Sequence, residues 1–288
     1  CAFINTYRQD MSSAASLPRR LRAERDCVAL LGKGCCVVDL AGCERYAIVI
    51  SSQGVAAIVG DVADDTLKVD ADAADGATLP AFAIGTRSDG TQVWLEYVSG
   101  SGGTYERCRP PRADDVRRGA AKAEGKWPAV IIESIARYYG LQALEPSVRG
   151  FLAILEKQFD RADAYVWELL QNGVDDGATQ VVVERLSERR GVRVSHDGRR
   201  FTPLDVLGLS SVGLSTKSLL SDGNAPRSIG FMGIGFKAVY RRFKRVTVSD
   251  GRWRFRYDEP RDRAPGEPKH AWVLRPAPLE LDGESTWC

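Results

Sequence analysis

The spacing of apolar residues changes once along this 288-residue chain, near Lys126. Before that point, apolar and polar residues alternate in short runs, which is typical of half-buried strands. After it, apolar residues recur every three or four positions, first in KWPAVIIESIARYYGL and then in SVRGFLAILEKQFDRADAYVWELLQNGVDD, which predicts helices. We therefore expect a small β-rich region of unnamed role over residues 1–125 and a second domain over residues 126–288.

Within the first region, two segments predict hairpins. Residues 46–60 are β-branched and contain a Gln-Gly step, and in residues 81–98 Asp89 and Gly90 form a two-residue turn between alternating runs. Residues 61–75 are acidic and Ala-rich, which favours an exposed loop. Residues 99–126 are rich in Gly, Arg and Pro, which favours a flexible linker.

The second region predicts an α+β fold with an antiparallel or mixed sheet. After the helices come two short strands, QVVVERL and VRVSHDG, with a turn between them. A Gly- and Ser-rich loop, a helix opening at Gly233 and the strands RVTVSD and RWRFRYD follow. Strands and helices do not alternate as they do in a parallel doubly wound sheet. In RWRFRYD, the alternation of Trp253 and Phe255 with arginines fits a half-buried strand better than a base-stacking surface.

Charge and hydropathy argue against several classes of protein. Forty Lys and Arg residues stand against 38 Asp and Glu, so the formal net charge of +2 gives no electrostatic basis for nucleic-acid binding. The basic runs at 19–25 and 241–245 are accordingly interpreted as solvated faces. No apolar run approaches the roughly 20 residues that a membrane span needs, and no leader peptide opens the chain. We expect an intracellular, cytoplasmic protein without membrane contact, and a nuclear location stays open.

The seven cysteines do not predict a disulfide scaffold, because their number is odd and nothing indicates secretion. Four of them, Cys27, Cys35, Cys36 and Cys43, cluster in the sequence. Their spacing lacks the paired C-x₂₋₄-C pattern of structural zinc sites. We interpret them as buried or free thiols.

The first group of chemically interesting residues is WELLQNGVDD, residues 167–176. On a helix, Glu168, Asn172 and Asp175 lie at positions i, i+4 and i+7 and share one stripe. A carboxylate and a carboxamide one turn apart suit oxygen ligation of Mg²⁺ and the positioning of a water molecule. An ordinary amphipathic helix with a solvated polar face is the alternative.

The second group, His196, Asp197 and Gly198, comes directly after a strand. A carboxylate at a strand end is a good acceptor for an exocyclic amine, and the glycine lets a ligand approach. The alternative is a plain Asp-Gly turn.

The third group is SIGFMGIGFKAVY, in which Gly230, Gly233 and Gly235 precede the run from Phe236 to Phe243. Such glycines let backbone N–H groups turn toward an anion at a helix N-terminus, and Lys237 supplies a further charge. The alternative is a glycine-rich packing turn. The loop before it, residues 209–228, contains Lys217 and fits a functional lid or a floppy surface loop.

Taken together, these motifs resemble the ATP-binding domain of the GHKL superfamily, which includes gyrase, the ninety-kilodalton heat-shock chaperones, histidine kinases and MutL. The resemblance covers residues 160–288 and is nearest to the sacsin-like branch, through SIGFMGIGFKAVY and the D-G-x-x-F-T form of the second motif. It implies a Bergerat-type α/β sandwich, with a mixed, mostly antiparallel sheet and helices on one face.

The resemblance also implies a role for each motif residue. Glu168 would be the general base, Asn172 the Mg²⁺ ligand and Asp175 a support for that helix end. Asp197 would bind the adenine amine, although an alignment on Gly198 and Phe201 selects His196 instead. The phosphate-binding residues would be Gly230, Gly233, Gly235, Phe236 and Lys237, with Lys217 as the lid cation. A strand-threonine motif would fall on Gly283 to Thr286, near the end of the chain.

The function implied is Mg²⁺-dependent ATP hydrolysis that drives lid closure in a larger chaperone-like or conformational-switch protein, with ATP and Mg²⁺ as cofactors. Its client is unknown, and a homodimer is compatible with it. Because the chain begins with Cys1 and stops at Cys288 within a predicted strand, we expect a fragment with an incomplete C-terminal domain. The alternative function is an ATP-binding sensor or scaffold without turnover. A histidine kinase would need a phosphoacceptor helix, and neither histidine, His196 or His270, lies on one.

Overall fold

The computed structural model describes residues 19–70, 78–121, 125–142, 148, 150, 152, 163–187, 191–211, 235–263, 267 and 270–279. Contacts between Cα atoms divide the chain into an N-terminal unit, Cys1–Ile135 with Thr202–Asp205, and a C-terminal unit, Ala136–Phe201 with Val206–Cys288. The division falls inside a helix, somewhat later than the boundary at residue 125 that the change in periodicity predicts. Each unit is described by itself.

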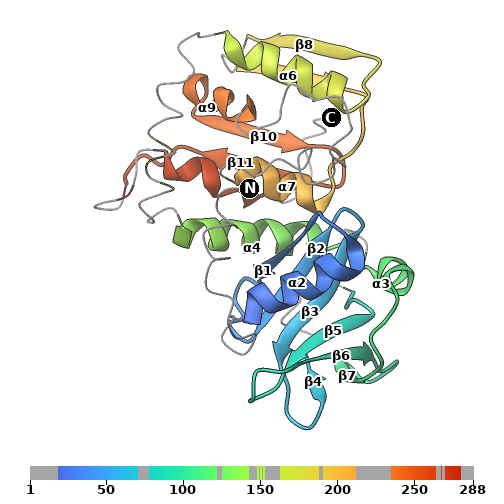
Figure 1. The fold of residues 1–288 in the computed structure, drawn as a ribbon. Coiled ribbons are helices and arrows are strands. Elements are labelled where there is room, and N and C mark those ends of the chain that lie inside the picture. Colours follow the sequence, from blue (N-terminus) through green and yellow to red (C-terminus); the bar gives the residue numbers. More distant parts are fainter. Residues whose placement is uncertain are drawn as a thin grey trace. The chain divides into compact units, whose positions relative to one another are not determined.

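The N-terminal unit contains a curled, seven-stranded mixed sheet in the order β1-β2-β3-β5-β6-β7-β4 (Figure 1). Its strands are β1 (Cys35–Asp39), β2 (Tyr46–Ser51), β3 (Gly54–Asp61), β4 (Thr66–Lys68), β5 (Phe82–Thr86), β6 (Gln92–Tyr97) and β7 (Thr104–Arg107). β3 and β5 pair in parallel, and all other neighbours pair antiparallel. β2 and β5 are buried along their whole length, which explains their nearly continuous apolar sequence.

Both predicted hairpins, β2–β3 and β5–β6, are confirmed. The turn of the second is longer than the expected two residues, because the Gly90 N–H donates to the Arg87 carbonyl and the Arg87 N–H donates to the Thr91 carbonyl. A two-residue turn of the predicted type needs positive φ at both Asp89 and Gly90. Only Gly90 has it, at 82°.

The interpretation of residues 99–126 as a flexible linker is wrong. This stretch contains β7 and the helix α3 (Ala113–Gly119), and the fully buried Tyr105 donates its hydroxyl hydrogen to the Pro80 carbonyl at 2.8 Å. The acidic stretch 61–75, of which residues 71–75 lie outside the described part, likewise contains β4, which pairs with β7. Here Gly and Pro are turn residues between short elements, so their density does not indicate a chain without structure.

The helix α2 (Arg19–Leu31) packs on one face of the sheet (Figure 1). Ala23 and Cys27 are fully buried against β-strand residues that include Cys35. The interpretation of the clustered cysteines as thiols agrees with this packing, since Cys27, Cys35, Cys36 and Cys43 are all free. Burial raises the pKa of Cys35 and that of Cys36 to about 12, so neither is a ready thiolate at neutral pH.

The C-terminal unit contains the helices and strands that its periodicity predicts. They are α4 (Trp127–Gln142), which crosses the division between units, α6 (Ala164–Asp175), β8 (Val181–Leu186), β9 (Gly191–His196), the 3₁₀ turn η4 (Gly235–Ala238), α9 (Val239–Arg242), β10 (Arg245–Ser249) and β11 (Arg254–Asp258). Three further elements were not predicted: α7 (Pro203–Ser210), η5 (Ala271–Leu274) and β12 (Ala277–Pro278). The glycine-led helix is present as η4 followed by α9.

An aromatic cluster forms the core of this unit. Trp253, Phe255 and Tyr257 are fully buried along β11. The ring of Tyr240, from α9, packs edge-on against Tyr257 at 5.3 Å and against Trp272 of η5 at 5.1 Å between centroids. The arginines that alternate with them in β11 are half-buried. The prediction of a half-buried strand is therefore confirmed.

Among the described residues, the strands of the C-terminal unit form two separate sheets, β8–β9 and β10–β11–β12, both antiparallel. α6 lies over β8 and β9 (Figure 1). The structure thus establishes a mixed α+β architecture with a large mixed sheet and several helices. The described residues do not establish the single sheet with helices on one face that the resemblance implies.

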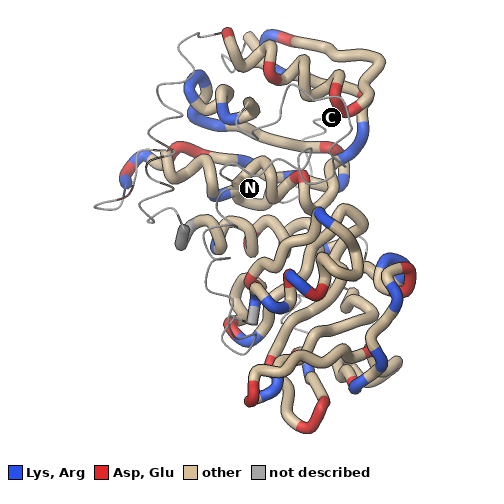
Figure 2. The backbone as a smooth tube through the Cα atoms, viewed as in Figure 1, with Lys and Arg blue, Asp and Glu red and all other residues tan. Residues whose placement is uncertain are grey.

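Lys and Arg positions cluster along the chain where α9 meets β10 (Figure 2). The exposed members of this group are Arg241, Arg242, Lys244 and Arg245. Lys244 pairs with Glu259 at 3.7 Å and Arg245 pairs with Asp258 at 2.5 Å, as expected of a solvated face. Within the described ranges, no helix combines the length and the apolar character needed to cross a membrane.

Candidate functional site

Helix α6 carries the first motif and organises the site. Its buried face rests on the β8–β9 hairpin through Gly173, where an added Cβ would lie 3.0 Å from Val181 Cγ2 and 3.7 Å from the His196 ring. Its outer face is open, since Trp167 is 65% and Val174 is 68% exposed. The helix ends at Asp175. The N–H of the next residue, Asp176, donates to the Asn172 carbonyl, and Gly177 follows with a positive φ of 75°.

Glu168 meets the third motif directly. A Cβ added to Gly235 would overlap the Glu168 carboxylate and lie 2.7 Å from its Cδ, so only glycine permits this approach. η4 therefore packs against α6 through its first residue. The first and third motifs, which are far apart in the sequence, therefore meet at the Glu168 carboxylate. The resemblance implies that this carboxylate is the general base.

Asn172, one helical turn beyond Glu168, is half-buried. Within the described part of the chain, no hydrogen bond engages its side-chain carboxamide, which leaves an oxygen for a ligand. Asp175 is exposed near the end of the helix. The polar stripe predicted from the sequence is thus present, with Glu168 at the η4 contact and Asn172 beside the glycine that packs on β9.

Asp197, which the sequence analysis prefers as the base-binding residue, is engaged by the chain next to β8. Its carboxylate accepts hydrogen bonds from the Thr179 N–H at 2.8 Å, the Thr179 hydroxyl at 2.5 Å and the Gln180 N–H at 2.9 Å. The Thr179 hydroxyl, followed by the Gln180 N–H, holds the pKa of Asp197 down at about 2. These hydrogen bonds hold the chain that enters β8, and the exposed carboxylate keeps some further acceptor capacity.

His196 takes the other orientation. Its ring lies against α6 at Gly173, and its Nδ1 accepts a hydrogen bond from the Gly198 N–H at 3.2 Å. Gly198 is needed for a packing reason, because a Cβ there would lie 3.0 Å from the Asp176 carbonyl oxygen. The sequence analysis expected this glycine to make room for a ligand. In the structure, the group that approaches Gly198 is the chain's own backbone at the end of α6.

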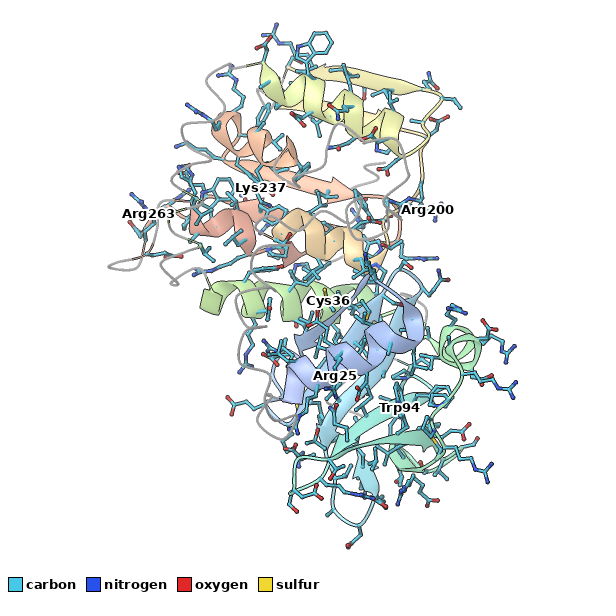
Figure 3. All side chains as sticks on the ribbon, viewed as in Figure 1. Arg25, Cys36, Trp94, Arg200, Lys237 and Arg263 are labelled. Carbon is cyan, nitrogen blue, oxygen red and sulfur yellow. The ribbon has the colours of Figure 1, made fainter. Side chains whose placement is uncertain are left out.

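Lys237 was expected beside the phosphates but is directed into the protein (Figure 3). It is 3% exposed, and its Nζ donates to the Leu209 carbonyl at 2.6 Å, in the last turn of α7. A cation suits the C-terminal end of a helix. Burial lowers the pKa of Lys237 to about 7. Its observed partner is therefore structural, because the 3₁₀ turn points the side chain toward the core.

This burial predicts an unusual pH dependence of stability. Between the folded pKa of about 7 and the ordinary value near 10.5, Lys237 is neutral in the folded protein and protonated in the unfolded chain, so stability should rise with pH. From pH 7 to pH 9, this group should raise the free energy of unfolding by an amount on the order of 2 kcal/mol. Lys237→Met should remove that increment in urea unfolding curves measured at both pH values. An equal increment in the two proteins would contradict the burial of the ammonium.

The remaining predicted residues divide into two groups. Phe236 is half-buried in η4, and its ring packs edge-on against Tyr240 at 5.8 Å. Lys217, Gly230, Gly233 and the segment Gly283 to Thr286 lie outside the described residues. Of the candidate phosphate-binding residues in the third motif, the structure therefore describes Gly235, Phe236 and Lys237.

Sequence reasoning missed the helix α7, although its signal was present. The Thr202 hydroxyl accepts from the Asp205 N–H at 3.3 Å, and the Asp205 carboxylate accepts from the Thr202 N–H at 2.8 Å. This is a capping box with Pro203 at the first helical position. The sequence T-P-L-D, residues 202–205, predicts such a helix start. Thr179 and Gln180, the partners of Asp197, carried no such signal.

No group of three or more His, Cys, Asp or Glu side chains that could hold a metal ion occurs among the described residues. A Mg²⁺ ion bound with a nucleotide does not need such a group, since phosphate and water oxygens complete its coordination. The Asn172 carboxamide fits this limited role. Comparisons with protein-family models, with curated proteins and with solved structures find no match to this chain.

Proposed function

We propose that the C-terminal unit binds a purine nucleoside triphosphate together with Mg²⁺ along α6 and hydrolyses it, with ATP as the expected nucleotide. In this proposal the unit is a GHKL-type ATPase with a Bergerat-type sandwich, and it serves a larger chaperone-like or conformational-switch protein. The observation that carries the proposal is the packing of the Glu168 carboxylate on Gly235.

The chemistry follows from what these side chains can do. Glu168 is held beside a glycine-led segment, where backbone N–H groups can meet an anion, and a carboxylate there can orient water for attack on a phosphoryl group. Asn172 offers an oxygen one turn away. When bound, Mg²⁺ would neutralise negative charge on the phosphates. Catalysis in this arrangement depends mainly on positioning, and residues of this chain do the positioning.

Phosphate release from the whole chain tests the proposal. With Mg-ATP, and in parallel with Mg-GTP, we expect slow turnover that EDTA abolishes. Isothermal titration under the same conditions separates binding from chemistry. Mg²⁺-dependent binding without any release would favour the alternative of a nucleotide sensor or scaffold. Absence of both binding and release for the two nucleotides would contradict the proposal.

A further inference from the structure

The β10–β11 pair has one apolar face and one basic face. In an antiparallel pair, residues directly opposite each other point to the same side. Val248 is opposite Phe255 and Val246 is opposite Tyr257, so these side chains share the face that forms the aromatic core. The other face, which we call the outer face, carries three further pairs: Arg245 with Asp258, Thr247 with Arg256 and Ser249 with Arg254.

Positive charge on the outer face exceeds negative charge. Of its six paired residues three are arginines, and Asp258 is the one carboxylate. Asp258 lies 2.5 Å from Arg245 and 2.7 Å from Arg256, so a single negative charge is shared by two guanidinium groups. The formal net charge of +2 for the whole chain does not reveal this local excess.

Arg254 is the arginine of this face that has no counter-ion. Its Nε is buried without a hydrogen-bond partner, and within the described part of the chain no carboxylate pairs with its guanidinium. A half-buried guanidinium in this state is unfavourable, and such a group calls for a partner. Ser249, directly across, adds an exposed hydroxyl. A phosphate group would satisfy both side chains, because its oxygens accept from a guanidinium in pairs.

Arg256 and Thr247 repeat this arrangement two residues along the strands. At about 3.4 Å per residue, Arg254 and Arg256 are separated by about 7 Å along β11. On its other side Arg256 is opposite Ala277 of β12, whose small, exposed side chain leaves the guanidinium accessible. The outer face therefore presents two guanidinium–hydroxyl pairs in a row, which suits successive phosphates of one chain.

We propose that the outer face of β10–β11 binds the phosphate backbone of single-stranded nucleic acid without reading its sequence. Sites for small phosphorylated molecules are concave, whereas an extended strand can lie on an exposed sheet surface. The aromatic side chains of β11 point into the core, so the bases have no stacking platform and the contacts are those to phosphates.

This binding does not depend on the proposed nucleotide site. Tyr240 of α9 packs against Tyr257, on the apolar face of the sheet. η4, which directly precedes α9, contacts Glu168 through Gly235. The contact between Glu168 and Gly235 is therefore on the side of the sheet away from Arg254.

Fluorescence anisotropy of the whole chain with a labelled oligo-dT of about 12 nucleotides, at several salt concentrations, tests the proposal. At about 50 mM salt we expect a dissociation constant on the order of micromolar. The logarithm of the affinity should fall against the logarithm of salt concentration with a slope of about −1.4, because each of two phosphate contacts contributes about −0.7. Oligo-dC of the same length should bind alike.

Three variants assign the binding to this face. Arg254→Gln should weaken it about tenfold and reduce the slope by about 0.7, since one phosphate contact is lost. Arg254→Lys keeps the charge and should keep the slope. Asp258→Asn should tighten binding about threefold, because it releases Arg245 and Arg256 from their shared carboxylate. Asp258→Asn also decides the matter if the Arg254 variants do not fold.

Arg117→Gln, on the exposed side of α3 in the N-terminal unit, removes the same charge and is the matched control. It should bind the oligonucleotide as the natural chain does, and so should Asn172→Ala, which alters only the proposed nucleotide site. Unchanged affinity in Arg254→Gln or in Asp258→Asn, or loss of binding in Asn172→Ala, would overturn the proposal. Equal affinity for a poly-glutamate peptide would also overturn it and would assign the face to acidic protein segments. A chain that binds the oligonucleotide but hydrolyses no nucleotide would contradict the proposed function alone.

Discussion

Replacing Gly235 with alanine should lower nucleotide hydrolysis by about 100-fold while the chain stays folded, because a displacement of a catalytic group by about 1 Å can cost that much. The new methyl group would occupy the space of the Glu168 carboxylate. Since that carboxylate is the end of a flexible side chain, it can swing away, and the free energy of unfolding should change by less than about 1 kcal/mol. Phosphate release and urea unfolding measure the two effects.

A double-mutant cycle makes this prediction specific. Glu168→Ala should itself reduce hydrolysis by about 100-fold or more, as expected for the loss of a general base. In the Glu168→Ala background, Gly235→Ala should have no further effect on the rate, because no carboxylate remains to be displaced. Additive losses in the double variant would show that Gly235 acts independently of Glu168, and the account of their contact would then be wrong.

Asn172→Ala should weaken Mg²⁺-dependent nucleotide binding by at least about 100-fold, because the variant loses an oxygen that ligates the ion. Isothermal titration with magnesium and with EDTA measures this change. Val174→Ala, on the exposed face of the same helix, is the control and should bind as the natural chain does. Unchanged affinity in Asn172→Ala would remove this residue from the metal site.

The elements that the sequence predicted well are those with strong local patterns. The hairpins β2–β3 and β5–β6 alternate cleanly, and α4 and α6 repeat apolar residues at helical spacing. The interpretation of residues 99–126 as a linker is wrong because β7 is short. This strand is held by its pairing with β4 and β6, and such pairing leaves no local pattern in the sequence. α2 was missed because its arginines obscured the apolar positions Ala23 and Cys27.

The candidate site was predictable in its residue types but not in its contacts. The stripe of Glu168 and Asn172 follows from helix geometry, whereas the approach of Gly235 to Glu168 depends on how η4 packs on α6. The choice between His196 and Asp197 depends on the register of β8 against β9, which brings Thr179 and Gln180 to the Asp197 carboxylate. The direction of Lys237 depends on a single 3₁₀ turn.

Hydrogen exchange on the whole chain, with and without magnesium and a non-hydrolysable nucleotide, tests the central claim most directly. If one triphosphate is held between α6 and the glycine-led segment, backbone amides in 164–175 and in 230–238 should gain protection together, and EDTA should abolish both gains. Protection of only one of these segments, or protection confined to the N-terminal sheet, would contradict a shared site.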